Sequence, residues 1–164
     1  MRHDNAQWAG TGAKWISMTG CQDEANLYLQ FARRFTCDGR GPLVLDITAV
    51  TQYQAAVNGQ VIGRGPAVSS PALYYFHRYI LSADELRAGE NLLTVLTFHD
   101  GRYTTTVQGF DYGEPGLLVH LYGASARVVS DAAWRVRRAP EYAPRASMVS
   151  QWGASRKSIV ADAT

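Results

Sequence analysis

AAVNGQVIGRGP, residues 55–66, is the segment that decides the fold. Two short apolar runs flank an Asn-Gly pair at 58–59, the dipeptide that best fills the central positions of a type I′ turn, where both residues need positive φ. A phosphate-binding loop would need a lysine and a following helix. The run GRGP at 63–66 offers neither, so the segment predicts a β-hairpin.

Strand-like segments recur along most of the chain. Alternating apolar residues, rich in β-branched and aromatic types and bounded by Gly, Pro, Asp or Ser, are typical of half-buried strands. They predict strands at 27–35, 43–50, 53–57, 60–63, 74–80, 91–99, 116–122, 126–130 and 134–138. Ser82 and Glu85 form a capping box that predicts one short helical turn. The expected fold is therefore all-β, a two-layer jelly-roll β-sandwich with one helical turn.

Composition and charge exclude several function classes. The chain has 164 residues, 46% of them hydrophobic, and a net charge of +2, which fits one globular domain. Its basic residues are scattered singly or in pairs, so no nucleic-acid partner is expected. The N-terminal residues contain no continuous apolar segment, which predicts no membrane partner and a cytoplasmic location. Secretion stays open if the intact protein carries another signal.

The expected domain organisation follows from shifts near the two ends. The first 13 residues are small and polar, and strand alternation stops from Pro140 onward. We expect an extended N-terminal segment at 1–14, a β-sandwich at 15–140, and a C-terminal extension or linker at 141–164 that leads towards a further region. Cys21 and Cys37 lack Cys-x-x-Cys spacing and are expected to be free thiols, with a disulfide as the alternative in an exported protein.

A family resemblance rests on the order of the motifs. The hairpin and the Gly-Arg-Gly-Pro run are followed by YYFHRYIL (74–81), LRAGENLLTVLTFHDG (86–101), GLLVHL (116–121) and SDAAWRV (130–136). In this order, over about residues 27–138, the chain resembles the N-terminal β-sandwich of bacterial α-L-rhamnosidases, inverting glycoside hydrolases with a downstream (α/α)6 barrel. The resemblance implies a galactose-binding-like sandwich, a downstream catalytic domain and a carbohydrate partner such as a rhamnose-containing glycan.

The chain itself is not expected to be an enzyme. An inverting glycosidase needs two carboxyl groups roughly 6.5 to 9.5 Å apart, and the sequence indicates no such pair. It also lacks a nucleophile elbow, and its histidines lack metal-ligand spacing. We therefore expect a non-catalytic accessory domain that packs against the catalytic barrel and contributes to carbohydrate binding. The alternatives are an autonomous carbohydrate-binding module and a protein-interaction sandwich.

FHDGRYTTTVQGFDYGEPG, residues 98–116, is the candidate carbohydrate site. A pyranose has an apolar face and a ring of hydroxyls, so its site combines an aromatic platform with polar partners. The expected binding residues are His99, Asp100, Arg102, Tyr103, Gln108, Asp111 and Tyr112. The alternative is a loop whose aromatic side chains fold back onto the core. No cofactor is expected apart from calcium, for which Asp100 and Asp111 are candidate ligands.

The remaining aromatic residues leave two questions open. Trp8 and Trp15 either form a binding platform or a lid, or pack against the sandwich edge, whereas Trp134 is expected in the core. In the strand at 74–80, alternation separates Tyr74, Phe76 and Arg78 from Tyr75, His77 and Tyr79. The pattern does not decide which set faces the core.

Overall fold

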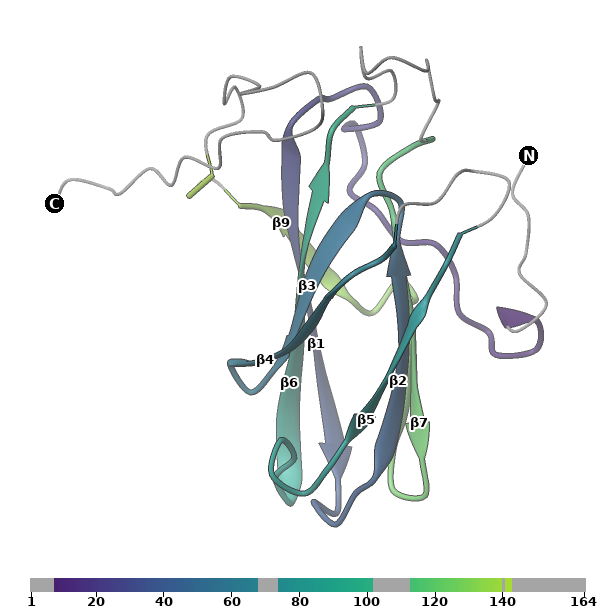
Figure 1. Ribbon diagram of the computed structural model, residues 1–164, viewed down its shortest axis with the longest axis vertical. Helices are drawn as coiled ribbons and strands as arrows, with labels where there is room; N and C mark the ends of the chain where they lie inside the picture. The colour runs from purple at the N-terminus through teal and green to yellow at the C-terminus, as the bar shows by residue number, and fades with distance from the viewer. Residues whose placement is uncertain (1–7, 68–73, 102–112, 140, 143–164) are drawn as a thin grey trace, which may run out of the picture.

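Two antiparallel sheets make up the computed structural model, which describes residues 8–67, 74–101, 113–139 and 141–142 (Figure 1). The five-stranded sheet has the order β4-β3-β6-β1-β9, and the four-stranded sheet has the order β5-β2-β7-β8. The strands are β1 (Leu27–Cys37), β2 (Leu43–Ala49), β3 (Gln52–Val57), β4 (Gln60–Gly65), β5 (His77–Leu81), β6 (Gly89–His99), β7 (Leu117–Gly123), β8 (Arg127–Val129) and β9 (Arg135–Arg138). The predicted all-β sandwich is confirmed.

The core lies between the inner faces of the two sheets. Side chains alternate between the faces of a strand, so every second residue of β1 and β6 points inward. The largest fully buried side chains come from both layers and are Phe31, Leu29, Leu43, Leu45, Ile47, Leu81, Leu93, Leu117, Leu121, Val57, Val95 and Val119. Trp134 belongs to the same cluster, as predicted. No helix among the described residues is long and apolar enough to cross a membrane.

The turn at 58–59 joins β3 to β4. Asn58 has φ 52° and Gly59 has φ 87°, both positive as a type I′ turn requires. The Asn58 side chain also donates to Asn91 Oδ1 at 2.8 Å and accepts from the Leu92 N–H at 3.1 Å. The predicted hairpin is confirmed, and its turn is tied to the central strand β6.

The predicted helical turn is wrong in one respect: residues 83–85 form a turn, and no α-helix is present among the described residues. Glu85 does accept from the Ser82 N–H at 2.7 Å, as a capping box requires. However, Asn91 Oδ1 accepts from the Arg87 N–H at 2.9 Å, and Asn91 Nδ2 donates to Arg87 O at 2.8 Å. These bonds occupy the backbone groups that a helix would use, and Leu86 is drawn into the core.

Strand β5 settles which face of the 74–80 segment is internal. The strand starts at His77, because β2 pairs with it only as far as Ile47. His77, Tyr79 and Leu81 face inward, whereas Arg78 and Ile80 are exposed on the outer face. Residues before the strand pack on the N-terminal segment instead, Phe76 against Trp8.

The two cysteines, Cys21 and Cys37, are both free and buried. Cys37 lies at the end of β1, where its Sγ accepts from Asn91 Nδ2 at 3.3 Å. Cys21 precedes β1 and belongs to the same hydrophobic cluster. Both thiols are therefore part of the packed interior.

Candidate functional site

The two sheets meet along two lateral seams. We call the seam between β4 and β5 the closed seam, because three aromatic side chains fill it. Tyr79 Oη donates to Arg64 O at 3.2 Å and lies 3.2 Å from Tyr53 Oη and 3.1 Å from His77 Nδ1. Burial raises the pKa of Tyr53, and its hydrogen bond to Tyr79 raises it further. The polar groups of the closed seam thus satisfy one another's hydrogen bonds.

The glycines of the Gly-Arg-Gly-Pro run make this closure possible. A Cβ at Gly63 would lie 2.4 Å from the Tyr79 ring, and one at Gly65 would lie 2.5 Å from the His77 ring. Both distances are far below ordinary van der Waals contact, so only glycine lets the β5 rings cover β4. The run therefore serves packing, consistent with the prediction that it is not a phosphate loop.

The seam on the opposite side, where β8 and β9 are the edge strands, contains a groove of about 440 Å³ between the segment 14–17 and the turn before β9. We call it the open seam. Its volume lies within the roughly 300–1,000 Å³ typical of small-molecule sites. The lining residues are Lys14, Trp15, Ile16, Ser17, Phe31, Asp131, Ala132, Trp134 and Val136. Phe31 and Trp134 are buried and form an apolar floor, while Lys14, Ser17 and Asp131 supply polar groups.

One wall of the groove is the N-terminal segment 14–17, which is held on the four-stranded sheet. Ile16 and Leu117 exchange backbone hydrogen bonds of 3.0 and 2.9 Å. The Lys14 N–H donates to Ser130 O at 2.8 Å, and Ser130 Oγ donates to Lys14 O at 2.7 Å. Ser130 Oγ also accepts from the Val119 N–H at 3.0 Å. One fully buried serine therefore fixes this wall to the sheet.

The opposite wall is the turn between β8 and β9. Asp131 Oδ1 accepts from the Ala133 N–H at 2.9 Å, an Asx turn that shapes the backbone. Arg33 Nη1 donates to Ala133 O at 2.8 Å, and Trp134 Nε1 donates to Val129 O at 2.8 Å. These bonds connect the turn to both sheets, so the groove has fixed walls.

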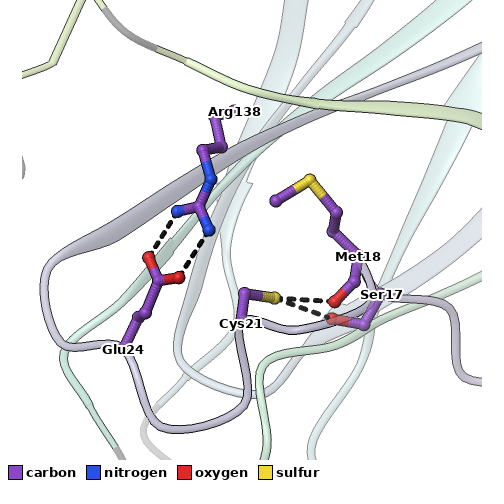
Figure 2. Close-up of polar contacts among 5 residues, drawn as sticks. All are labelled: Ser17, Met18, Cys21, Glu24 and Arg138. Atoms are coloured by element: carbon purple, nitrogen blue, oxygen red, sulfur yellow. Dashed lines mark hydrogen bonds and ion pairs between the residues drawn. The ribbon is translucent and has the colours of Figure 1, made fainter.

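Residues 17–24 close the open seam beyond the groove. Figure 2 shows the Arg138 guanidinium making two contacts with the Glu24 carboxylate, which tie this segment to β9. Cys21 Sγ donates to Met18 O at 2.8 Å and lies 3.8 Å from Ser17 Oγ (Figure 2). The hydrogen bond from Arg138 lowers the pKa of Glu24, so the pair is charged at neutral pH.

His99, a predicted binding residue, is buried with 2% of its surface exposed. Its Nδ1 accepts from the Gly101 N–H at 3.2 Å, so the proton resides on Nε2, which lies 3.1 Å from Gly113 O. Burial lowers the pKa of His99 and favours the neutral ring. His99 thus contacts both Gly101 and Gly113, the two ends of the connection between β6 and β7.

Asp100, the next predicted residue, lies close enough to Tyr28 of β1 for its carboxylate to act on the phenol. Burial raises the pKa of Asp100. Burial also raises the pKa of Tyr28, and the Asp100 carboxylate raises it further. Tyr28 stacks on Tyr142 with a centroid distance of 4.5 Å. The other predicted residues lie outside the described residues, namely Arg102, Tyr103, Gln108, Asp111 and Tyr112.

The calcium prediction involves one described residue, Asp100. The described ranges contain no group of three or more His, Cys, Asp or Glu side chains that could hold a metal ion. The second candidate ligand, Asp111, lies in the stretch that the structure does not describe. Calcium binding by this connection stays a prediction.

Trp15 contributes both to the groove of the open seam and to the packing at the end of the 98–116 segment. Its ring lies 5.0 Å from the Tyr74 ring, and a Cβ at Gly116 would lie 3.0 Å from the indole. The indole therefore packs beside the end of the 98–116 segment, while the residue also lines the groove. Sequence reasoning did not identify Lys14, Ser17, Phe31 or Val136 as site residues. The one sequence feature that pointed to this groove was Trp134, which lies next to a turn.

The comparisons with known proteins support the family resemblance. No family model matches the chain, and no curated protein matches it. Among solved structures, the GH78 family rhamnosidase of Bacillus sp. GL1 matches 77% of this chain with 30% identity and a TM-score of 0.68. The α-L-rhamnosidase of Aspergillus terreus matches 79% with 24% identity and a TM-score of 0.61. A lectin of Pleurotus ostreatus matches 91% of this chain and 41% of its own, with 17% identity and a TM-score of 0.59.

The extent of these matches is as informative as their quality. The chain spans 13% of the length of the Bacillus rhamnosidase and 17% of the Aspergillus enzyme. The lectin match, at low identity, supports the sandwich fold alone. Over 77% of its length, the chain is therefore similar to a domain-sized part of a GH78 rhamnosidase, as its motifs predicted.

Proposed function

We propose that this chain is a non-catalytic accessory domain of an α-L-rhamnosidase-like glycoside hydrolase, and that its open seam is a carbohydrate-binding groove. The observation that carries the proposal is the 30% identity to the Bacillus rhamnosidase over 77% of this chain and 13% of that enzyme. A match of this size corresponds to one domain of a larger hydrolase.

The carboxylates of the described residues support a non-catalytic role. Glycoside hydrolysis needs two carboxyl groups that flank one sugar. Among the lining residues of the groove, Asp131 is the single carboxylate, and it is engaged in the Asx turn. Other acidic side chains are occupied in ion pairs, Asp46 with Arg78 at 2.7 Å and Glu90 with Arg34 at 2.6 Å.

The groove suits a sugar because of its two kinds of surface. Pyranose rings place C–H groups against apolar side chains and direct hydroxyls towards polar ones. The half-buried Trp15 and Ile16 side chains, together with the buried floor of Phe31 and Trp134, meet the first need. The polar groups of Lys14, Ser17 and Asp131 meet the second.

The outer face of the four-stranded sheet supports packing against a neighbouring domain. Ile80 is 70% exposed there, and the strand register places it beside Val44 and Tyr122. Val44 and Tyr122 are half-buried, so the row has one strongly exposed member. Apolar surface of this kind is typical of sites that contact another protein or domain. We propose this row as the part of the chain that packs against the catalytic barrel.

The test is a thermal-shift and calorimetric screen of the purified chain against L-rhamnose, galactose, glucuronate and rhamnogalacturonan fragments. Ala132→Trp places a large ring in the groove, and Ala133→Trp is a matched control at an exposed neighbour that does not line it. We expect saturable binding that Ala132→Trp abolishes and Ala133→Trp preserves.

Two other results would revise the proposal. Binding that survives Ala132→Trp and is lost in Tyr112→Ala would move the site to the 98–116 segment, where the sequence places it. A flat response to every sugar at millimolar concentration would contradict carbohydrate binding and leave the structural role.

A further inference from the structure

Strand β9 presents one unused pair of main-chain groups to the open seam. Within the described residues it is an edge strand, paired with β1 alone. The Ala139 N–H donates to Tyr28 O at 3.0 Å, in register with the pairing of Leu29 with Arg138. In an antiparallel ladder, hydrogen-bonded and non-hydrogen-bonded pairs alternate. The N–H and C=O of Val136 therefore point away from β1, at the groove that Val136 lines.

The segment 14–17 presents a second such pair on the other wall. The N–H and C=O groups of Lys14 and Ile16 are both directed to the four-stranded sheet, where they bond Ser130 and Leu117. In an extended segment the intervening residue directs its groups the opposite way. The N–H and C=O of Trp15 therefore face away from that sheet, on the side of the open seam.

These groups define the chemistry of a ligand. The N–H and C=O of one extended residue lie side by side, so they offer a donor next to an acceptor. Two vicinal hydroxyls offer the complementary pair, because each hydroxyl both donates and accepts. The side chains at the rim, Lys14 and Asp131, have opposite charges, so the lining residues favour no net ligand charge.

We infer that the open seam binds a neutral saccharide through main-chain groups, with the Val136 and Trp15 N–H and C=O pairs each engaging vicinal hydroxyls of the sugar. This inference rests on the proposed function and adds the recognition mode and the ligand class. The half-buried Trp15 and Ile16 side chains, with the buried Phe31 and Trp134 as the floor, provide the apolar surface for the ring.

A peptide strand would be the other ligand of such an edge, and the geometry favours it less. Strand addition uses a run of alternating free backbone groups. Strand β9 has four residues, and its other outward position, Arg138, already has its C=O occupied by Arg137 Nη1 at 3.1 Å. One free pair suits a diol better than a strand.

Val136→Pro is the decisive variant. Proline removes the N–H but is tolerated on an edge strand where that group points outward, so the β1 ladder stays intact. Val136→Ala is the matched control, since it shortens the side chain and keeps the N–H. We expect Val136→Pro to weaken the binding of L-rhamnose about tenfold, the equivalent of one lost hydrogen bond. Val136→Ala should weaken binding clearly less than Val136→Pro does, because it keeps the N–H and leaves the edge backbone unchanged.

A second measurement needs no variant. In a ¹⁵N-labelled sample titrated with L-rhamnose, the amide signals of Val136 and Trp15 should shift most, while the inward-bonded amide of Arg137 stays fixed. 2,3-Di-O-methyl-L-rhamnose, which cannot donate from those positions, should bind far more weakly.

The outcomes separate this inference from the proposed function. Main-chain recognition is overturned if Val136→Pro binds L-rhamnose normally, or if Val136→Ala weakens binding as much as Val136→Pro does. The groove remains the sugar site in either case if Ala132→Trp abolishes binding. Unmoved Val136 and Trp15 amides during a saturable titration overturn it in the same way. A shift caused only by peptides overturns the saccharide assignment. If no sugar produces a response, carbohydrate binding by the groove and main-chain recognition are both contradicted, and the structural role of the domain remains.

Discussion

The two lateral seams of the sandwich bring together the same two sheets and differ in what lies between them. At the closed seam, Tyr53, His77 and Tyr79 bond one another and the β4 backbone. At the open seam, a separate segment, 14–17, forms one wall, and its hydrogen bonds go to the sheet behind it. Side chains that hydrogen-bond to one another close a seam. A wall formed by the backbone of an extended segment instead leaves some main-chain N–H and C=O groups at the surface.

The floor of the open seam gives the largest expected effect. Trp134 is 8% exposed and bonds Val129 O, so Trp134→Ala removes a large buried ring and a hydrogen bond. We expect a loss of about 3–5 kcal/mol in the free energy of unfolding, measured by urea denaturation. Trp15→Ala, at a half-buried ring, is the control and should cost less. Equal losses would mean that the groove floor is not part of the core.

The closed seam should respond to added volume. Gly63→Ala places a methyl 2.4 Å from the Tyr79 ring and should cost about 1–3 kcal/mol of unfolding free energy, because the ring must move. Val61→Ala on the same strand, at a side chain 51% exposed, should cost less than about 0.5 kcal/mol. Urea denaturation of both variants gives the comparison. An unaffected Gly63→Ala would show that the seam is loosely packed.

The wall of the open seam depends on Ser130. Ser130→Ala leaves the Val119 N–H and the Lys14 C=O without their partner, which should cost about 1–2 kcal/mol. Amide exchange should also accelerate at Lys14 and Ile16 while the β1 and β6 amides stay protected. Uniform acceleration across both sheets would contradict a local role for this serine.

The polar network of the closed seam predicts a smaller effect. Tyr79→Phe keeps the ring over Gly63 and removes the hydroxyl that donates to Arg64 O. We expect a loss of about 0.5–1.5 kcal/mol in thermal or urea unfolding, the usual net contribution of a hydrogen bond. Tyr53→Phe, made in the same background, tests coupling, because the two hydroxyls lie 3.2 Å apart. Additive losses would mean that they act independently.

The seams also show what could be predicted from sequence. The hairpin was predictable because the Asn-Gly pair at 58–59 sets its own dihedral angles. The inner face of β5 was not, since aromatic residues occupy both faces of YYFHRYI. The residues that decide which face of β5 is internal lie on β4. There Gly63 and Gly65 alternate with Arg64 and leave room for aromatic rings from β5.

The groove could not be predicted because its residues come from separate segments. The segment 14–17, Phe31, and the turn at 131–134 meet only through the register of β9 on β1 and the bridge from Ile16 to Leu117. Period-2 patterns identify strands but not which edges lie together. Of the predicted binding residues, His99 and Asp100 lie in the described part, and the role of the whole set stays a prediction.

The ion pair between Glu24 and Arg138, which ties residues 17–24 to β9 beyond the groove, should give the smallest effect. Glu24 and Arg138 are both partly exposed, so solvent screens their attraction. Because the folded-state pKa of Glu24 is lowered, its contribution is present above the unfolded value near 4.5 and is lost as the pH falls through the folded value. Glu24→Gln should therefore lower the melting temperature slightly at pH 7 and by less as the pH falls below about 4.5, with Glu90→Gln as the control for a more exposed pair. A loss as large as that of Tyr79→Phe would mean that this seam, too, is held shut by its side chains.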